Sequence, residues 1–585
     1  MDDDTNKPLT TPDSTDALEP TNVAQAETEN EGLAEAPADV TQDEQPEDQN
    51  RTDDTKNVSE QKTEPAVVIG DHGKSKKTKI LAVLFIAILL LGLGFLAYQA
   101  FFKKEESTKT VTGVIVKKDV PVMNVSVNPT PINSFYPSEE QIQAPNYLIN
   151  SQLYEGLVQF DDISKIKPAL ASSWTNPDDE TWVFTLKKGV KFHDGNVMTA
   201  NDVKTSLETY SGKAYAGLFA FSTKKIEVVN DNQIKITTDG PDPLLLHKLA
   251  YLAVVDAKSI AQKDAILSGT GPYTIKNNTT PSEASVNLVA FDKYHGGHVY
   301  TRELKFVAVD EDSAQIDALI NNKADFANGF ATKSELDKLN SKNTITAVPQ
   351  EGLGSSYLGV NHKNTKSPLA NLKVRQAISL ALDRQELISA SDLSATQSFQ
   401  LVTKEVPGYN PSIKPTKQNI EKAKQLLTEA GYPSGFSYNL SYVSGLADKQ
   451  ANEISKQLKV IGITSKLDAQ KDFTAYNAKW DSGQLEGFIE GYTSDLFDAS
   501  DVYGFMVNDN PYYSNQQVSD LLDKASSTLD QNKRLVYLQQ ASKLLNDDLN
   551  VIPTYVVNAP YAFKKSLVVQ PGIYAGPYFW QVYQK

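Results

Sequence analysis

The sequence predicts an α/β fold, preceded by a disordered acidic tail and one transmembrane helix. Three observations lead to this prediction. From about residue 120 to the end, strand-like and helix-like patterns alternate; residues 80–102 form an uncharged apolar run; and residues 1–73 contain very few large apolar side chains. Repeated helix, glycine and strand signals are typical of α/β architecture.

The N-terminal tail, residues 1–79, is predicted to be disordered and cytoplasmic. Its first 73 residues hold 20 acidic and 4 basic side chains, which accounts for the whole formal charge of −16 and leaves the rest of the chain neutral. Such a segment cannot bury enough apolar surface to offset the entropy lost on ordering. We expect a solvated spacer, with an acidic interaction arm as the alternative. The neutral body argues against nucleic acid as a partner, because it offers no basic excess to phosphates.

Residues 80–102, ILAVLFIAILLLGLGFLAYQAFF, are predicted to anchor the chain in the cell membrane as a single-pass helix. A helix of this length rises about 34 Å, enough to cross a hydrocarbon core of about 30 Å. The run is too long, and begins too late, for a cleaved signal peptide. Lysines crowd its N-terminal flank, which favours a cytoplasmic N-terminus and an extracellular body. Residues 103–118 are expected to form a polar tether.

Local patterns in the body predict individual strands and helices. The alternating apolar residues of TWVFTL (181–186) and SYNLSYV (437–443) predict two strands. Apolar residues three and four apart predict three helices: one that follows Asn371 as N-cap, one that ends at Gly431, and one that ends at Gly462.

The stretch VKFHDGNVMTANDV places His193 beside Asp194, a pair that raises the question of catalysis. Together with the preceding strand it is typical of a hairpin, with turns at Gly189 and at the Asp-Gly pair. Thr199 and Asp202 then form a capping box at the start of a helix. No second histidine and no nucleophile lie nearby in the sequence, so we interpret His193 as part of the scaffold.

The composition gives no support for an enzyme. The chain has no cysteine, which removes disulfides, thiolate nucleophiles, cysteine zinc sites and lipid-modified cysteine anchors together. It has no paired-histidine metal motif and no glycine-flanked nucleophilic serine. The spacing of His295 and His298, in YHGGH, is compatible with a metal, but a glycine turn is the favoured interpretation. We therefore predict no catalytic residue, no metal site and no cofactor.

Several segments of the body resemble one known family. They are LYEGLVQFDD, KPALASSWTNPDDETWVFTLKKGVKFHDGNVMTANDV, GTGPYTI, ALINNKADF, YLGVNHKN, NLKVRQAISLALDRQELI, AKQLLTEAGYPSGF and VIPTY. In this order they resemble the peptide- and nickel-type extracellular solute-binding proteins, which serve oligopeptide and dipeptide ABC transporters. The resemblance covers about residues 120–585.

The resemblance implies a periplasmic-binding-protein-like fold over residues 119–585, with two α/β lobes that close on a ligand about a hinge. Lobe one would comprise 119–358 and 553–585, with an extra subdomain at about 155–240, and lobe two would comprise 359–552. The hinge would lie near YLGVN and VIPTY, and the last segment would return to lobe one.

The resemblance also points to a ligand site in GYTSDLFDASDVY. The family commonly shows a Trp-Gly-x-Asp-x-x-Asp-Pro run here, and in its peptide binders the first Asp pairs with the ligand ammonium. Those two positions are Asp495 and Asp498, although Tyr492 stands for the Trp and Ala499 for the Pro. The alternative is that either aspartate only caps the following turn. The aromatic side chains expected to line the cleft are Tyr492, Tyr503 and Trp480.

The function implied is that of a membrane-anchored, monomeric receptor. It would capture oligopeptides or dipeptides outside the cell and hand them to the permease subunits of an ABC transporter. A binder of nickel, of a metal chelate or of another small solute is the alternative within the same class. A ligand sensor that uses the same fold, with its acidic tail on a cytoplasmic partner, is a second alternative.

Overall fold

A computed structural model describes residues 117–127, 146–161, 165–210, 223–262, 267–276, 285–309, 312–570 and 577–585. The predicted acidic tail, the predicted span at 80–102 and most of the predicted tether lie outside these residues. Within the ranges that are described, no helix is long and apolar enough to cross a bilayer.

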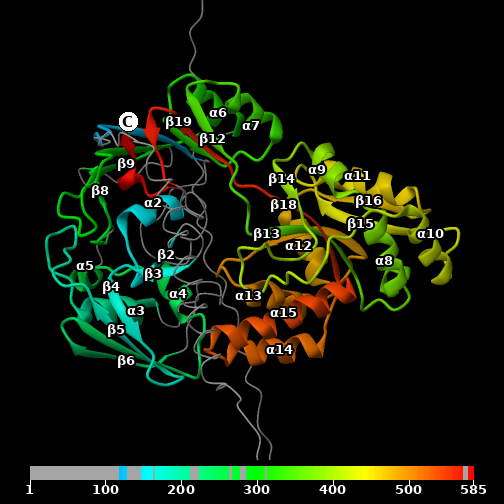
Figure 1. Ribbon diagram of the computed structural model, residues 1–585, viewed down its shortest axis with the longest axis horizontal. Coiled ribbons are helices and arrows are strands. Elements are labelled where there is room, and N and C mark those ends of the chain that lie inside the picture. The colour runs from blue at the N-terminus through cyan, green and yellow to red at the C-terminus, as the bar shows by residue number, and fades with distance from the viewer. Residues whose placement is uncertain are drawn as a thin grey trace, which may run out of the picture. The chain divides into compact units, whose positions relative to one another are not determined.

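Lobe one is built on a mixed seven-stranded sheet of order β12-β19-β11-β1-β10-β9-β8 (Figure 1). The strands are β1 (Met123–Val127), β8 (Tyr273–Ile275), β9 (Ser285–Ala290), β10 (Glu303–Ala308), β11 (Phe326–Asn328), β12 (Ile345–Val348) and β19 (Tyr561–Lys564). Strand β1 pairs in parallel with β10 and β11, and the remaining pairs are antiparallel. Apolar clusters bury both faces of this sheet, with α2 (Asn146–Leu153) in one cluster and α6 (Asp312–Ile320) and α7 (Lys333–Asn340) in the other.

A subdomain with its own core is inserted in lobe one. It contains a four-stranded antiparallel sheet of order β4-β5-β7-β6 and a two-stranded β2-β3 sheet. The strands are β2 (Val158–Phe160), β3 (Ile166–Pro168), β4 (Ala171–Thr175), β5 (Thr181–Leu186), β6 (Thr223–Asn230) and β7 (Gln233–Thr238), and the helices are α3 (Ala200–Tyr210) and α4 (Leu245–Tyr251). The core also takes in Val254, so the subdomain extends beyond the predicted end near 240. Helix α5 (Ala257–Gln262) follows it.

The hairpin predicted around Gly189 is wrong in its second strand. TWVFTL does form β5, but β5 pairs with β4 on one edge and β7 on the other. No edge of β5 is left for the residues after Gly189, which make only a single bridge between Lys191 and Val197. The predicted helix start is observed, since the Asp202 carboxylate accepts hydrogen bonds from the backbone N–H and the hydroxyl of Thr199, at 2.8 and 2.9 Å.

Lobe two is a six-stranded sheet of order β14-β18-β13-β17-β15-β16 with a layer of helices on each face (Figure 1). The strands are β13 (Gly354–Val360), β14 (Ala395–Gln397), β15 (Ser437–Val443), β16 (Thr464–Gln470), β17 (Gly487–Thr493) and β18 (Val551–Val557). One face packs on α8 (Leu372–Ala381), α9 (Arg384–Ser391), α10 (Ile420–Glu429) and α11 (Asp448–Lys459). The other packs on α12 (Phe473–Asp481), α13 (Ala499–Gly504), α14 (Gln516–Ser526) and α15 (Gln531–Asp548), with a π-helical turn η3 (Phe505–Asp509) after α13.

The local signals in lobe two are observed as predicted. The Asn371 side chain accepts the backbone N–H of Lys373 and caps α8. Gly431 and Gly462 follow α10 and α11 with φ of +89° each, a left-handed conformation that glycine adopts without the Cβ penalty of other residues.

The predicted lobe boundaries are displaced by several residues. The hinge was expected near YLGVN and VIPTY; these two segments lie in β13 and β18, which pair with each other near the middle of the lobe-two sheet. Both strands are buried on both faces. The chain passes between the two sheets at 349–353 and 558–560 instead. The final segment returns to lobe one as predicted. Phe579, in η4 (Phe579–Gln581), and Val582 join the core there, and β20 (Leu567–Val568) pairs with β21 (Tyr583–Gln584).

Candidate functional site

A cavity of about 450 Å³ lies where the chain passes between the two sheets. Its walls come from the first residues of β13, the last residues of β17 and both connecting segments. The lining residues are Gln350, Glu351, Gly352, Leu353, Gly354, Ser355, Ser356, Gly491, Tyr492, Thr493, Val557, Asn558 and Ala559. Two glycines allow the backbones to approach here: a Cβ on Gly354 would lie 2.0 Å from the Tyr492 carbonyl oxygen, and one on Gly352 would lie 2.2 Å from the Val557 carbonyl oxygen.

Immediately after β17, residues 494–498 form a loop that contacts lobe one; we call it the 494–498 loop. The Leu496 side chain is buried in the core of the lobe-one subdomain. Conversely, Phe160 from lobe one is buried in a lobe-two cluster, and its ring centroid lies 4.5 Å from that of Phe497. The Tyr251 hydroxyl donates a 2.7 Å hydrogen bond to the Asp495 carbonyl oxygen. The loop that carries the predicted ligand aspartates is therefore an interlobe contact.

The Asp495 carboxylate has the environment expected of a group that receives a cation. It is half-buried, and burial raises its pKa above the ordinary value. Within the part of the chain that the structure describes, no residue donates a hydrogen bond to this carboxylate or forms an ion pair with it. A carboxylate that has lost water and gained no partner gains most from a ligand that supplies positive charge.

Asp498, the second predicted aspartate, is instead part of the scaffold. Its two oxygens accept from the Arg534 guanidinium at 2.5 and 2.7 Å, and its side chain caps α13 through the Ser500 backbone N–H at 2.9 Å. Burial by itself would raise the pKa of Asp498, but Arg534 and Ser500 outweigh it and hold the pKa below the ordinary value. Both oxygens are occupied in a buried site, so we reassign Asp498 to the alternative role of capping the turn.

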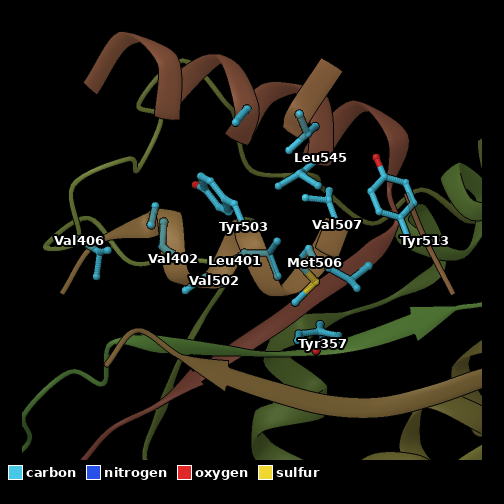
Figure 2. Close-up of a cluster of buried hydrophobic side chains, with 14 of the residues drawn as sticks. Tyr357, Leu401, Val402, Val406, Val502, Tyr503, Met506, Val507, Tyr513 and Leu545 are labelled. Carbon is cyan, nitrogen blue, oxygen red and sulfur yellow. The ribbon is translucent and has the colours of Figure 1, made fainter. Parts of the chain in front are cut away.

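The three predicted aromatic residues occupy different environments. Tyr492 lines the cavity and stacks on Phe505 with ring centroids 4.7 Å apart. Phe505 stacks in turn on Trp480 at 5.8 Å, so Trp480 supports Tyr492 from behind. Tyr503 is buried among apolar side chains, and its hydroxyl donates to the Gly408 carbonyl oxygen at 3.2 Å (Figure 2). Of the three, only Tyr492 lines the cavity.

The three histidines considered in the sequence, His193, His295 and His298, each contact other groups of the protein. His193 packs edge-on against Phe291, and its Nε2 lies 3.1 Å from the Gly271 carbonyl oxygen. Burial lowers its pKa to about 4, so the ring is neutral near pH 7. His295 and His298 contact two different carboxylates, Glu155 at 2.8 Å and Asp119 at 2.7 Å. In the described ranges, no group of three or more His, Cys, Asp or Glu side chains is arranged to hold a metal ion.

Sequence reasoning missed two carboxylates beside this site. Glu490 lies on β17 opposite Tyr357, and burial raises its pKa above the ordinary value. Strand alternation places it on the same face as Tyr492, two residues later, a signal that was available in the sequence. Asp501 lies in α13 and contacts the 494–498 loop. No pattern distinguished it from the other aspartates of the segment.

Comparison with known proteins gives one consistent result. Residues 165–514 match the model of the bacterial extracellular solute-binding proteins, family 5 (middle region). Heme-binding protein A of Haemophilus influenzae is 26% identical over 460 residues, 70% of this chain and 83% of that protein. The glutathione-binding protein GsiB of Salmonella choleraesuis is 28% identical over 489 residues, 77% of this chain and 92% of that protein. The solved structure of DppA from Helicobacter pylori in complex with the peptide STSA superposes with a TM-score of 0.64 at 24% identity, covering 80% of this chain and 98% of that one, a likeness of fold.

Proposed function

The chain belongs to the bacterial extracellular solute-binding proteins of family 5, and we propose that it captures peptides outside the cell between its two lobes and delivers them to the permease subunits of an ABC transporter. Proteins of this family are binding components of transport systems and not enzymes. The proposal is therefore one of capture and release without chemical change.

The observation that carries the proposal is the half-buried Asp495 carboxylate, to which no described residue donates a hydrogen bond. It lies in the interlobe loop that follows the cavity-lining residues Tyr492 and Thr493. A peptide brings an N-terminal ammonium, which an acidic group in a partly dehydrated site binds strongly. The cavity volume of about 450 Å³ lies within the range of about 300–1,000 Å³ typical of small-ligand sites. Tyr492, which stacks on Phe505 and through it on Trp480, gives one wall an aromatic surface suited to an apolar side chain.

Two relatives are named for different ligands, so the ligand class must be inferred from the residues of this site. One relative is named for heme and another for glutathione. Glutathione carries a free ammonium, whereas heme carries carboxylates and no amine. The Asp495 carboxylate attracts an ammonium, as in glutathione, and repels carboxylates, as in heme. This favours a peptide over heme.

We further propose that residues 80–102 hold this receptor in the cell membrane as a single pass, with the acidic tail in the cytoplasm and the binding domain outside as a monomer. The uncharged run and the lysines before it support the proposal. Protease added to intact cells would digest the binding domain and leave a fragment that contains the tail. Digestion of the tail with survival of the binding domain would overturn this orientation.

Native mass spectrometry of the full-length chain, purified from its own cells, tests ligand capture. We expect bound masses that fragment as peptides, and their loss in Asp495→Asn. The matched control is Asp481→Asn, which removes the same charge from an exposed position and should keep the bound masses. Unchanged peptide binding by Asp495→Asn would reject this residue as the anchor. A bound mass that lacks an amine, such as heme, would reject the peptide assignment.

A further inference from the structure

The geometry of the 494–498 loop depends on one buried carboxylate outside it, that of Asp501. Its Oδ2 accepts hydrogen bonds from the Ser494 hydroxyl and from the backbone N–H of Leu496, both at 3.1 Å. Its Oδ1 accepts the backbone N–H of Val502 at 2.6 Å. Asp501 therefore contacts the loop on both sides of Asp495, the proposed ligand anchor.

The loop needs this support because its backbone is strained. Phe497 has a φ of +53°, a left-handed conformation that is unfavourable for a bulky L-residue. Such conformations are costly and persist only where the surroundings fix them. Here the surroundings are lobe one, which buries Leu496, and Asp501, which binds the backbone of the same residue.

The charges around Asp501 favour its neutral form. Its charged neighbour is Asp498, whose own charge is already matched by Arg534. The other titratable groups that face it are the hydroxyls of Tyr492 and Tyr503, and no described residue gives it a cation. Burial raises the pKa of Asp501 to about 7, although the hydrogen bonds from the Leu496 and Val502 N–H groups lower it; repulsion from Asp498 is a smaller cause of the rise.

The hydrogen bonds at Ser494 also suit a neutral Asp501. The Ser494 oxygen accepts from the Asp498 backbone N–H at 2.8 Å and lies 3.0 Å from the Asp498 carbonyl oxygen. A serine hydroxyl has one proton to donate. If Asp501 is protonated, it can donate to Ser494 while Ser494 donates to that carbonyl oxygen, and every group is satisfied. If Asp501 is ionised, both acceptors compete for the one serine proton.

We propose that Asp501 is a positioning residue that holds the 494–498 loop against lobe one when it is protonated, and that its ionisation loosens the loop and so displaces Asp495, the proposed ligand anchor. The consequence for ligands rests on the proposed peptide capture; the loop movement does not. Through this residue the receptor would hold its ligand more firmly at mildly acidic pH than at alkaline pH.

The sign of the effect follows from proton linkage. In a loosened loop, Asp501 would meet water and return toward its ordinary pKa of 3.8. The docked loop binds the proton more tightly than the loosened loop, so docking is favoured at low pH and loses stability as pH rises through about 7. One such group changes the docking equilibrium about tenfold between pH values of about 6 and about 8.

Hydrogen–deuterium exchange of the ligand-free, full-length chain tests this. We expect the backbone N–H of Leu496 to be about tenfold better protected at pH about 6 than at about 8, after correction for intrinsic exchange rates. Asp501→Asn keeps the neutral form at every pH, so its protection should be nearly the same at both. Asp523→Asn, an exposed aspartate on α14, should keep the wild-type difference.

Protection of Leu496 that does not change with pH in the unmodified chain would overturn the proposal, and this measurement needs no variant. A pH-dependent change that persists in Asp501→Asn would also overturn it. Because no ligand is present, the result is independent of whether peptides are the cargo. If exchange behaves as expected and no peptide co-purifies, the loop mechanism stands and the proposed function fails.

Discussion

Both carboxylate oxygens of Asp498 are bound by the guanidinium of Arg534, at 2.5 and 2.7 Å, and both side chains are almost completely buried. This pair ties the start of α13 to α15, and so fixes the base from which the 494–498 loop extends. Asp498, which the sequence suggested as a ligand group, therefore has a structural role: it holds the loop that carries the site.

Removal of one partner of this pair should destabilise the protein strongly. Asp498→Ala leaves the Arg534 charge buried without a counter-charge, a change that costs about 3–5 kcal/mol. Denaturant unfolding of the full-length chain measures the loss. Lys543→Ala is the control: it breaks the exposed Lys543–Asp547 pair and should cost less than about 1 kcal/mol. Equal effects of the two substitutions would contradict the structural role assigned to Asp498.

Phe497 allows the backbone strain in the loop to be measured separately from its ring contact. Alanine and glycine both remove the ring that packs on Phe160, but only glycine adopts a φ of +53° freely. Phe497→Gly should therefore be more stable than Phe497→Ala by about 1 kcal/mol, the reverse of the usual order in regular structure. Thermal unfolding of the two variants gives the comparison. An alanine variant as stable as the glycine variant would show that the loop is unstrained.

The sequence predicted individual elements well and their partners less well. TWVFTL is a strand because its alternating side chains bury one face, a local property. Its pairing with β4 and β7 instead of the residues after Gly189 depends on β7, about 50 positions later in the chain. The crossing near YLGVN could not be placed to the residue for a similar reason: an apolar run buried on both faces has the same composition in a central strand as in a crossing segment.

The sequence predicts which residue types the site contains, but it does not distinguish between residues of the same type. Asp495 and Asp498 are alike in the sequence, three positions apart, and their difference comes from Arg534, which lies on a helix beyond the segment. Tyr492 and Tyr503 differ in the same way, since one ends a strand at the cavity and the other is packed between helices (Figure 2). Such distinctions require the tertiary neighbours.

His193 should make the folded protein less stable in acid. Burial lowers its pKa to about 4 from the ordinary value of 6.5, so the fold binds the proton less tightly than the unfolded chain. Its stabilising effect is complete above pH about 6.5 and declines as the pH falls toward about 4. In His193→Gln, the free energy of unfolding should fall less steeply as the pH decreases, by the slope that corresponds to the uptake of about one proton. Denaturant unfolding across that pH range measures this slope.

Wild type is the appropriate comparison for His193→Gln, because His247 and His362, whose pKa values burial also lowers to about 4, contribute the same slope to both proteins. Asp501, with its raised pKa, contributes a slope of the opposite sign to both. An unchanged acid slope in His193→Gln would mean that the ring is solvated in the native protein.

Gly354 tests whether the cavity depends on the close approach of β13 and β17. A Cβ at this position would lie 2.0 Å from the Tyr492 carbonyl oxygen and 2.5 Å from the Thr493 Cα, both of them backbone atoms that cannot move independently of the strand. Gly354→Ala must therefore displace β17 beside Tyr492, and we expect a loss of about 1–3 kcal/mol in unfolding free energy together with weaker ligand retention. Gly504→Ala is the matched control, since its helical backbone leaves the added methyl 3.9 Å from the nearest side chain, and it should be neutral or stabilising by up to about 1 kcal/mol. Retention of bound ligand by Gly354→Ala at the wild-type level would place the ligand away from this junction.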